Sequence, residues 1–167
     1  LGQRYFCGLS IPKDNPSGLY SKEGTYEVVV PKDIKAAMKW FTKSAEQGEI
    51  IAQASLGASY LNGISVPEDH KAAVKWLTKA AEQGDANSQS LLGRIHRNGE
   101  GVPKDHKAAV KWYTKAAEQG GCASQYYLGE MYCNGEGVPE DHKAAVKWYR
   151  KAAEQGHANA QYNLGGM

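Results

Sequence analysis

The residues in this sequence with the clearest chemical potential are histidines and lysines that recur at fixed spacing. His70, His106 and His142 each follow an aspartate, and each begins a segment in which lysines recur every fourth residue. Histidine could bind zinc, but zinc needs its ligands about 2 Å from one ion, whereas packed helices lie about 8 to 10 Å apart. Because the histidines fall on successive units of the chain, we predict no metal site and no cofactor.

The lysines form rows that could contact phosphate groups. These rows consist of Lys35, Lys39, Lys43, Lys71, Lys75, Lys79, Lys107, Lys111, Lys115, Lys143, Lys147 and Lys151. A glutamate follows each row by three residues, at Glu46, Glu82, Glu118 and Glu154. Single-stranded nucleic acids are bound by basic grooves with exposed aromatic rings, and none is expected to interleave here. We therefore interpret the rows as solvated helix faces with i,i+3 ion pairs, which argues against nucleic acid as a partner.

A cysteine nucleophile is the remaining enzymatic candidate. Cys122 lies at the expected start of a helix, where a thiolate is favoured, and His157 lies near the same point one unit later. No third residue that could orient this pair and no oxyanion site is visible. The three cysteines, Cys7, Cys122 and Cys133, are expected to be free thiols. We predict no catalytic residue and no enzymatic activity.

The histidines and lysines belong to a segment that returns every 36 residues, a register kept by Trp40, Trp76, Trp112 and Trp148. A period between about 20 and 50 residues indicates a solenoid whose neighbouring units share one core. We predict an all-α fold of helix-turn-helix repeats, with two helices, A and B, in each unit. The predicted B helices are 33–47, 69–83, 105–119 and 141–155, and the full A helices are 50–62, 86–98 and 122–134.

Local signals define these helices. Asp69 can cap the start of a B helix, and Gly84 can adopt the left-handed conformation that ends it. Two apolar rows lie between them and predict a buried stripe that includes the tryptophan; the rows are Ala72, Trp76, Ala80 and Ala73, Leu77, Ala81. Gly93 in mid-helix costs about 1 kcal/mol relative to alanine, so we expect a close helix contact there.

The N-terminal part departs from the period. Residues 1–8 match the middle of an A helix, and 9–32 form an irregular insertion before the units 33–65, 66–101, 102–137 and 138–167 of a single domain, 1–167. Within the insertion, residues 15–29 include LYS, KEG and TYEVVV, a pattern typical of a short β-hairpin. Both a tolerated loop insertion and a binding or dimerisation element remain open for it.

Composition excludes several classes of protein. Charged residues make up 23% and apolar residues 41%, as in globular chains, and the formal net charge of +2 indicates neither nucleic acid nor membrane. No apolar run approaches the ~18 residues of a membrane-spanning helix, so we expect a soluble protein of unknown compartment. The chain lacks an initiator methionine and starts inside a motif, which suggests a fragment. Uncapped terminal repeats, or the insertion, could support a homo-oligomer.

The copies differ mainly on the outward face of the A helices. The variable outward residues are Ala54, Ala58, Leu61, Ser90, Arg94, Arg97, Tyr126, Glu130, Cys133 and Tyr162. Aligned across repeats, they would line the concave inner wall of the superhelix, with the aromatic and arginine side chains that interfaces favour. Neutral drift explains this variation equally well. If the protein binds a peptide or protein segment, we expect it in this groove.

The recurring pattern LGxxYxxGxGVPxD followed by KAxxWYxKAAEQG closely resembles the Sel-1-like repeat family. The resemblance covers residues 30–167 and implies a right-handed α-α superhelix that acts as a scaffold or adaptor in protein complexes. A cysteine-rich branch of the family is associated with β-lactam binding and hydrolysis. That branch carries a cysteine in the KAA segment of each repeat, where this chain has Ala80, Ala116 and Ala152. The resemblance therefore favours a binding scaffold over a hydrolase.

Overall fold

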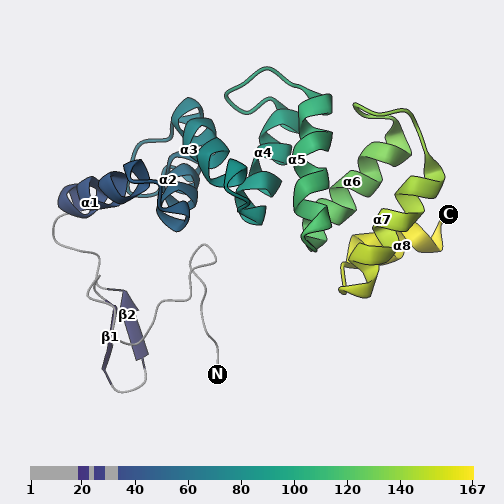
Figure 1. Cartoon of the computed structure of the whole chain (residues 1–167). Helices are drawn as coiled ribbons and strands as arrows, with labels where there is room; N and C mark the ends of the chain where they lie inside the picture. Colours follow the sequence, from purple (N-terminus) through teal and green to yellow (C-terminus); the bar gives the residue numbers. More distant parts are fainter. Residues whose placement is uncertain (1–18, 23–24, 29–33) are drawn as a thin grey trace.

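The computed structural model describes residues 19–22, 25–28 and 34–167, and the side chains from Met38 onward. Within these residues the chain forms eight helices and two short strands (Figure 1). The helices are α1 (Ile34–Glu46), α2 (Ile50–Asn62), α3 (His70–Glu82), α4 (Ala86–Asn98), α5 (His106–Glu118), α6 (Cys122–Asn134), α7 (His142–Glu154) and α8 (Ala158–Gly165). The A helices are α2, α4, α6 and α8, and the B helices are α1, α3, α5 and α7.

The predicted helices are confirmed to within one residue at each end. Three A helices match without a shift, and α3, α5 and α7 begin one residue after their predicted starts because the preceding residue is the cap. The side chain of Asp69, for example, accepts a hydrogen bond from the backbone N–H of Ala72 at 2.9 Å. The glycines that end the B helices, Gly84, Gly120 and Gly156, all have positive φ.

The expected β-hairpin is also present. Strand β1 (Leu19–Lys22) pairs antiparallel with β2 (Thr25–Val28), with Leu19 opposite Val28 and Lys22 opposite Thr25. The partial helix expected at 1–8 lies outside the described residues, as does most of the insertion at 9–32. Apart from this hairpin, the described fold is a helical solenoid, as predicted.

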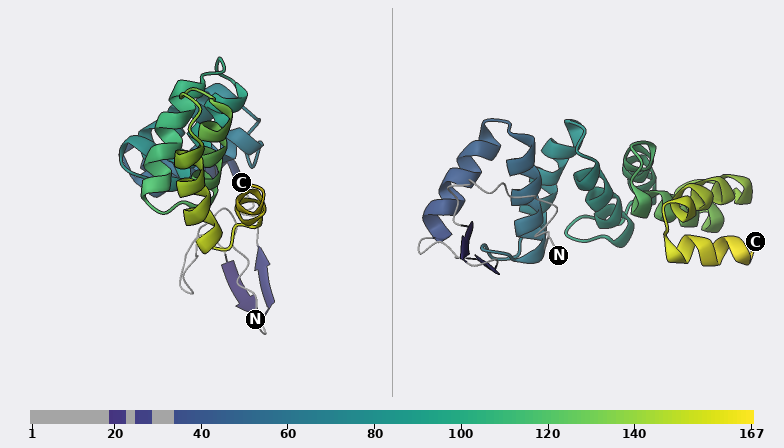
Figure 2. Two further views of the ribbon diagram at one scale, coloured as in Figure 1. Left: turned by 90° about the vertical axis from the view of Figure 1, so that its right-hand side faces the viewer. Right: turned by 90° about the horizontal axis from the view of Figure 1, so that it is seen from below.

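The helices follow one another in a single elongated row from α1 to α8 (Figure 1, Figure 2). Each A helix packs closely against the B helix that follows it, and each B helix contacts the A helix of the next repeat. Glycine permits the first of these contacts, because a Cβ at Gly93 would lie 2.6 Å from the ring of Tyr113. The close approach offsets the cost of a glycine inside a helix.

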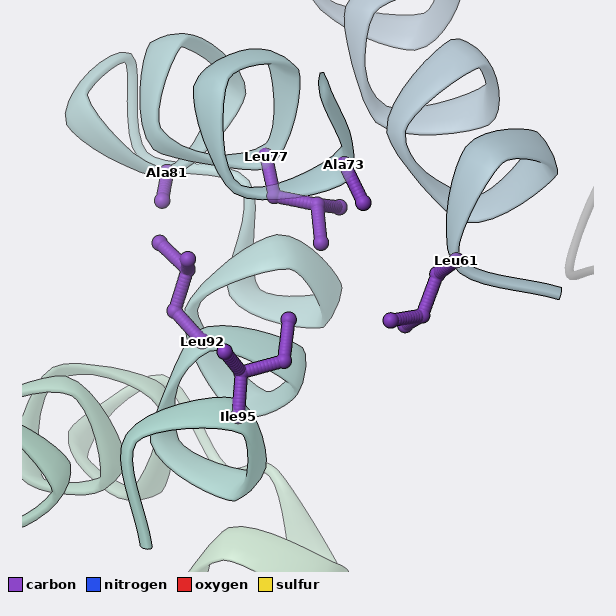
Figure 3. Close-up of a cluster of buried hydrophobic side chains, with 6 residues drawn as sticks. All are labelled: Leu61, Ala73, Leu77, Ala81, Leu92 and Ile95. Carbon is purple, nitrogen blue, oxygen red and sulfur yellow. The ribbon is translucent and has the colours of Figure 1, made fainter. Parts of the chain in front are cut away.

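The hydrophobic core runs between repeats. One cluster joins Leu61 of α2, three residues of α3, and Leu92 and Ile95 of α4, and Figure 3 shows these side chains pointing toward one another. Trp112 of the following repeat packs against this cluster from outside. A single unit therefore leaves part of its apolar surface uncovered until its neighbours are present, as in other repeat proteins.

The tryptophans are not equally buried, although the sequence pattern predicts a buried stripe that includes the tryptophan of a B helix. Trp76 is only 7% exposed, whereas Trp40 is 66% exposed. Trp76 lies in one cluster with Ala45 and Leu56 of the preceding repeat, and the partly buried Trp112 packs in the same way against the cluster before it. The residues one period before Trp40 lie outside the described part of the chain.

A ladder of glutamine hydrogen bonds joins the helices. The side-chain amide of Gln89 in α4 donates to the carbonyl of Ala81 in α3 at 3.0 Å, and its own oxygen accepts from Gln119 at 2.8 Å. Gln53 and Gln125 make the equivalent bonds. The glutamines are nearly buried, so these bonds satisfy polar groups that would otherwise be costly to bury.

Candidate interaction surface

The variable residues of the A helices form a partly exposed surface, here called the A-helix wall. It consists of Ala54, Ala58, Ser90, Arg94, Arg97, Tyr126, Glu130, Cys133 and Tyr162. The sequence also placed Leu61 on this surface, and for this residue the prediction is wrong. Its side chain is 5% exposed and lies in the core cluster with Leu92 and Ile95, because the next A helix covers this end of α2.

Arg97 is the centre of a charged network that links two repeats. Its Nη1 lies 2.9 Å from Glu130 Oε2 and its Nε lies 3.0 Å from Glu136 Oε2, while its guanidinium carbon lies 5.7 Å from the Tyr127 ring centroid. These ionic side chains are 20 to 25% exposed. The guanidinium is therefore occupied within the protein and is not the free interface anchor that the sequence suggested.

The network shifts the ionisation of its members. Desolvation alone would raise the pKa of Glu136, but the hydrogen bond and the positive charge of Arg97 outweigh it and hold that pKa below its usual value. The pKa of Arg97 is raised, because the two glutamates outweigh the opposing effect of its own burial. Both shifts favour the charged forms, so the ion pairs persist at neutral pH.

Tyr126 is fixed by three groups. Its hydroxyl donates to Glu130 Oε1 at 2.8 Å, its ring stacks on His157 with centroids 4.5 Å apart, and Tyr127 meets it edge-on at 5.4 Å. Burial, followed by the hydrogen bond to Glu130, raises the pKa of Tyr126 to about 12. Glu130 therefore accepts from both Arg97 and Tyr126, and the wall side chains of α4 and α6 form one connected unit.

A serine pair provides a second link between the same helices. The hydroxyl of Ser124 in α6 donates to that of Ser90 in α4 at 2.8 Å, so this bond joins adjacent repeats. Ser88 occupies the equivalent position to Ser124 one repeat earlier and is fully buried, but its hydroxyl has no hydrogen-bond partner among the described residues. The residue in register with Ser90 is Ala54, which has no hydroxyl. The wall is therefore linked between α4 and α6 but not, at this position, between α2 and α4.

Two wall residues remain accessible to a partner. The side chain of Arg94 is 42% exposed, and its nearest carboxylate, Glu100, lies 3.5 Å away. Tyr162 on α8 is 84% exposed. Tyr162, Glu130 and Cys133 line an open hollow. Arg94 and Tyr162 are therefore the cation and the aromatic ring that the wall offers to solvent.

The lysine rows are exposed, but their partners differ from the prediction. Lys79 Nζ lies 4.7 Å from the Trp76 ring centroid, and Lys115 lies 4.7 Å from that of Trp112. Among the described side chains, none of these lysines forms an ion pair with a glutamate. For the last lysine of each row, the i,i+3 neighbour that attracts the ammonium is the preceding tryptophan, whose ring face stabilises an exposed cation.

The residues considered for catalysis or metal binding have structural contacts. The thiol of Cys122 donates to the carbonyl of Ala152 at 3.7 Å. His157 caps α8 by accepting the N–H of Ala160 at 3.4 Å, and it also stacks on Tyr126. His142 lies 2.9 Å from Glu140. Over the described ranges, no group of three or more side chains is arranged to hold a metal ion.

Sequence reasoning missed Glu136, Tyr127 and His157 as parts of this surface. Glu136 lies in the turn after α6 and reaches back to Arg97, 39 residues earlier. Its recurrence at Glu100 in the same register was the available signal, because Glu100 likewise approaches Arg94.

The alanines that replace the cysteines of the β-lactam-associated branch, Ala80, Ala116 and Ala152, are fully buried.

The fold and the wall define a helical repeat protein with a polar and aromatic surface along one row of helices. The model of the Sel1 repeat matches residues 1–20, 21–49, 50–85, 86–121 and 122–157, and the chain belongs to the Sel1 repeat family. No curated protein matches the chain. No helix in the described part of the chain has the length and apolar character needed to cross a membrane.

Solved structures support this assignment. A protective antigen of uropathogenic Escherichia coli with an SLR fold is 44% identical, with a TM-score of 0.78 over 81% of this chain and 29% of its own. The chain thus spans less than a third of that protein. A Sel1 repeat protein from Oxalobacter formigenes is 37% identical, with a TM-score of 0.71 over 78% of this chain and 98% of its own. Cysteine rich protein B of Helicobacter pylori is 29% identical, with a TM-score of 0.62 over 81% and 98%.

Proposed function

We propose that this chain is a non-enzymatic scaffold that binds a peptide or protein segment along the A-helix wall. Sel1 repeat proteins typically serve as protein-interaction scaffolds and are generally not catalytic. In a curved stack, the helices on the inner side approach one another most closely. The bonds from Ser124 to Ser90 and from Arg97 to Glu130 connect consecutive A helices directly, which supports a concave wall formed by these helices.

The observation that carries the proposal is the organisation of the wall. Arg97, Glu130 and Tyr126 are held in a connected network before any partner arrives, so binding does not require ordering these side chains. Arg94 and Tyr162 remain exposed beside that network. Arginine and tyrosine are the residue types that contribute most often to interface hot spots.

A peptide-display library panned on the 167-residue chain tests this proposal. The double variant Arg94→Glu with Tyr162→Ala changes only the accessible groups of the wall. A control, Arg150→Glu with Asn159→Ala, makes the same charge reversal and a smaller truncation at exposed positions outside the wall. We expect the selected peptides to bind the wall variant at least ~10-fold more weakly, corresponding to about 1.4 kcal/mol, and the control with unchanged affinity.

Equal binding of the selected peptides to wild type and the wall variant would show that the wall is not the binding surface. Equal loss in both double variants would also contradict the proposal, because the effect would then be general rather than local. Circular dichroism on each variant establishes that the helices are intact, so that a loss of affinity reports on the surface alone.

A further inference from the structure

The B helices α3, α5 and α7 carry a basic surface that the A-helix wall does not include. Each of these helices has three lysines, all of them exposed, and together these lysines are here called the lysine ridge. The three helices contain ten basic and three acidic residues, a net charge of +7, whereas the whole chain carries +2. The rest of the chain is therefore net negative, and positive charge is concentrated on the B helices.

The ridge gathers its ammonium groups around tryptophan rings. Lys75 and Lys79 lie 5.6 Å and 4.7 Å from the Trp76 ring centroid, and the equivalent pair on α5 lies 6.0 Å and 4.7 Å from that of Trp112. The ring attracts both cations, but it also keeps two like charges close together on one helix face. In the described part of the chain no carboxylate forms an ion pair with a ridge lysine, so the protein itself does not neutralise these charges.

The spacing of the ridge matches an extended acidic chain. Lysines four residues apart on a helix are separated by about 6 Å along the helix axis. In an extended polypeptide, alternate side chains point the same way and lie about 6.6–6.8 Å apart. A segment with acidic residues at alternate positions therefore places carboxylates opposite successive ammonium groups of one helix.

Two other anionic partners fit the ridge less well. An anionic membrane surface is nearly flat, but α3, α5 and α7 run in different directions along the row (Figure 1), and the exposed large apolar side chains of the described residues lie elsewhere. Single-stranded nucleic acid binds by stacking its bases on exposed aromatic rings, whereas the tryptophan rings of these helices are already contacted by their own lysines. A flexible polypeptide can follow the changing direction of the helices and needs no stacking surface.

We propose that the lysine ridge is a binding surface separate from the wall and that its partner is an acidic polypeptide segment. Carboxylates of the segment lie beside the ammonium groups around Trp76 and Trp112 and neutralise them. The rings keep these ammonium groups near their bound positions, which lowers the side-chain entropy lost on binding. Because the contact is electrostatic and exposed, its affinity falls as the salt concentration rises.

Fluorescence anisotropy of a labelled oligoglutamate peptide, titrated at low salt with the 167-residue chain, tests this proposal. The ridge variant Lys75→Gln with Lys111→Gln removes one ammonium beside each ring, and glutamine keeps the helix propensity of lysine. The control Asn87→Asp with Lys104→Gln lowers the net charge by the same amount at exposed positions outside the ridge. We expect the ridge variant to bind at least ~5-fold more weakly than wild type, because each lost ion pair weakens binding a few-fold. The control is expected to bind with nearly unchanged affinity.

Absence of oligoglutamate binding to wild type at low salt would overturn the proposal, as would an affinity that added salt does not lower. Unchanged binding by the ridge variant, or equal weakening in the ridge variant and the control, would also overturn it, because the ridge would then not be the site. Circular dichroism on each variant checks that the helices are intact.

The same titration with phosphatidylserine vesicles and with a single-stranded oligonucleotide identifies the class of partner. Tighter binding of either than of oligoglutamate, with a loss in the ridge variant, would overturn the assignment to an acidic polypeptide. The wall variant, Arg94→Glu with Tyr162→Ala, keeps every ridge lysine and is expected to bind oligoglutamate like the control. The proposals for the ridge and for the wall can therefore fail separately.

Discussion

Two serines in the same register are expected to respond to the same substitution with opposite signs. Ser124→Ala removes a hydroxyl that is hydrogen bonded to Ser90 at 2.8 Å. Ser88→Ala removes a hydroxyl that is fully buried and has no partner in the described part of the chain. Both side chains lie at the same position of an A helix, so helix propensity, size and backbone effects cancel in the comparison.

The magnitudes follow from the two environments. A typical hydrogen bond contributes about 0.5–1.5 kcal/mol net, so Ser124→Ala is expected to lower the free energy of unfolding by about 1 kcal/mol. An unsatisfied buried polar group costs about 1–3 kcal/mol, so Ser88→Ala is expected to raise the free energy of unfolding by about 1 kcal/mol or more. The two variants should therefore differ by about 2 kcal/mol.

Urea denaturation followed by circular dichroism measures both changes, provided that the slope m is the same for each variant. A third variant, Ala54→Ser, supplies the missing partner for Ser88 and is expected to stabilise the protein. In that background, Ser88→Ala becomes destabilising, and the double-mutant cycle yields a coupling between positions 54 and 88. If both serine variants change stability by the same amount and sign, or if Ala54→Ser has no coupling to Ser88, the assignment of the unpaired hydroxyl is wrong.

Three further predictions concern the network and the helix contact. Arg97 lowers the pKa of Glu136, so this ion pair stabilises the fold above about pH 4.3, the usual pKa of glutamate, and the contribution is lost as the pH falls further. Glu136→Gln is therefore expected to be less stable than wild type at pH 7. In acid denaturation scans, the difference in stability between the two proteins is expected to vanish. Gly93→Ala is expected to destabilise the protein in urea, since three atoms of the Tyr113 ring lie within 2.8 Å of the added carbon and the overpacking cost of about 1–3 kcal/mol outweighs the helix-propensity gain. Because the pKa of Tyr126 is raised to about 12, its stabilising contribution is lost as the pH rises from about 10 to 12. Ultraviolet titration of Tyr126→Phe should show one fewer tyrosine that ionises only at high pH. An unchanged number of such tyrosines would contradict the assignment.

Helix positions could be predicted from the sequence because their signals are local. The side chains of Asp69 and its counterparts accept a hydrogen bond from a backbone N–H three residues later. The glycine after each B helix itself adopts the positive φ that ends the helix. The fold class followed from the period alone, since a unit of 36 residues that repeats in register must share its core with its neighbours. The β-hairpin could be predicted for the same reason, because its sequence signals are also local.

Burial and pairing could not be predicted in the same way, because they depend on neighbouring repeats. Leu61 and Arg97 hold the same register, yet one lies in the core and the other in an ion-pair network with Glu130 and Glu136. Trp40 and Trp76 share a motif but differ from 66% to 7% in exposure. Variation between the copies suggested where the wall lies, but the partners of Arg97 come from positions 33 and 39 residues away.

The most direct test of the proposed binding surface is a map of amide chemical-shift changes when a library-selected peptide is added to the 167-residue chain. The proposal predicts that the largest changes occur along the A-helix wall, around Ser90, Arg94, Glu130 and Tyr162. Changes concentrated instead on the exposed B-helix lysines, such as Lys75, Lys111 and Lys147, would contradict it.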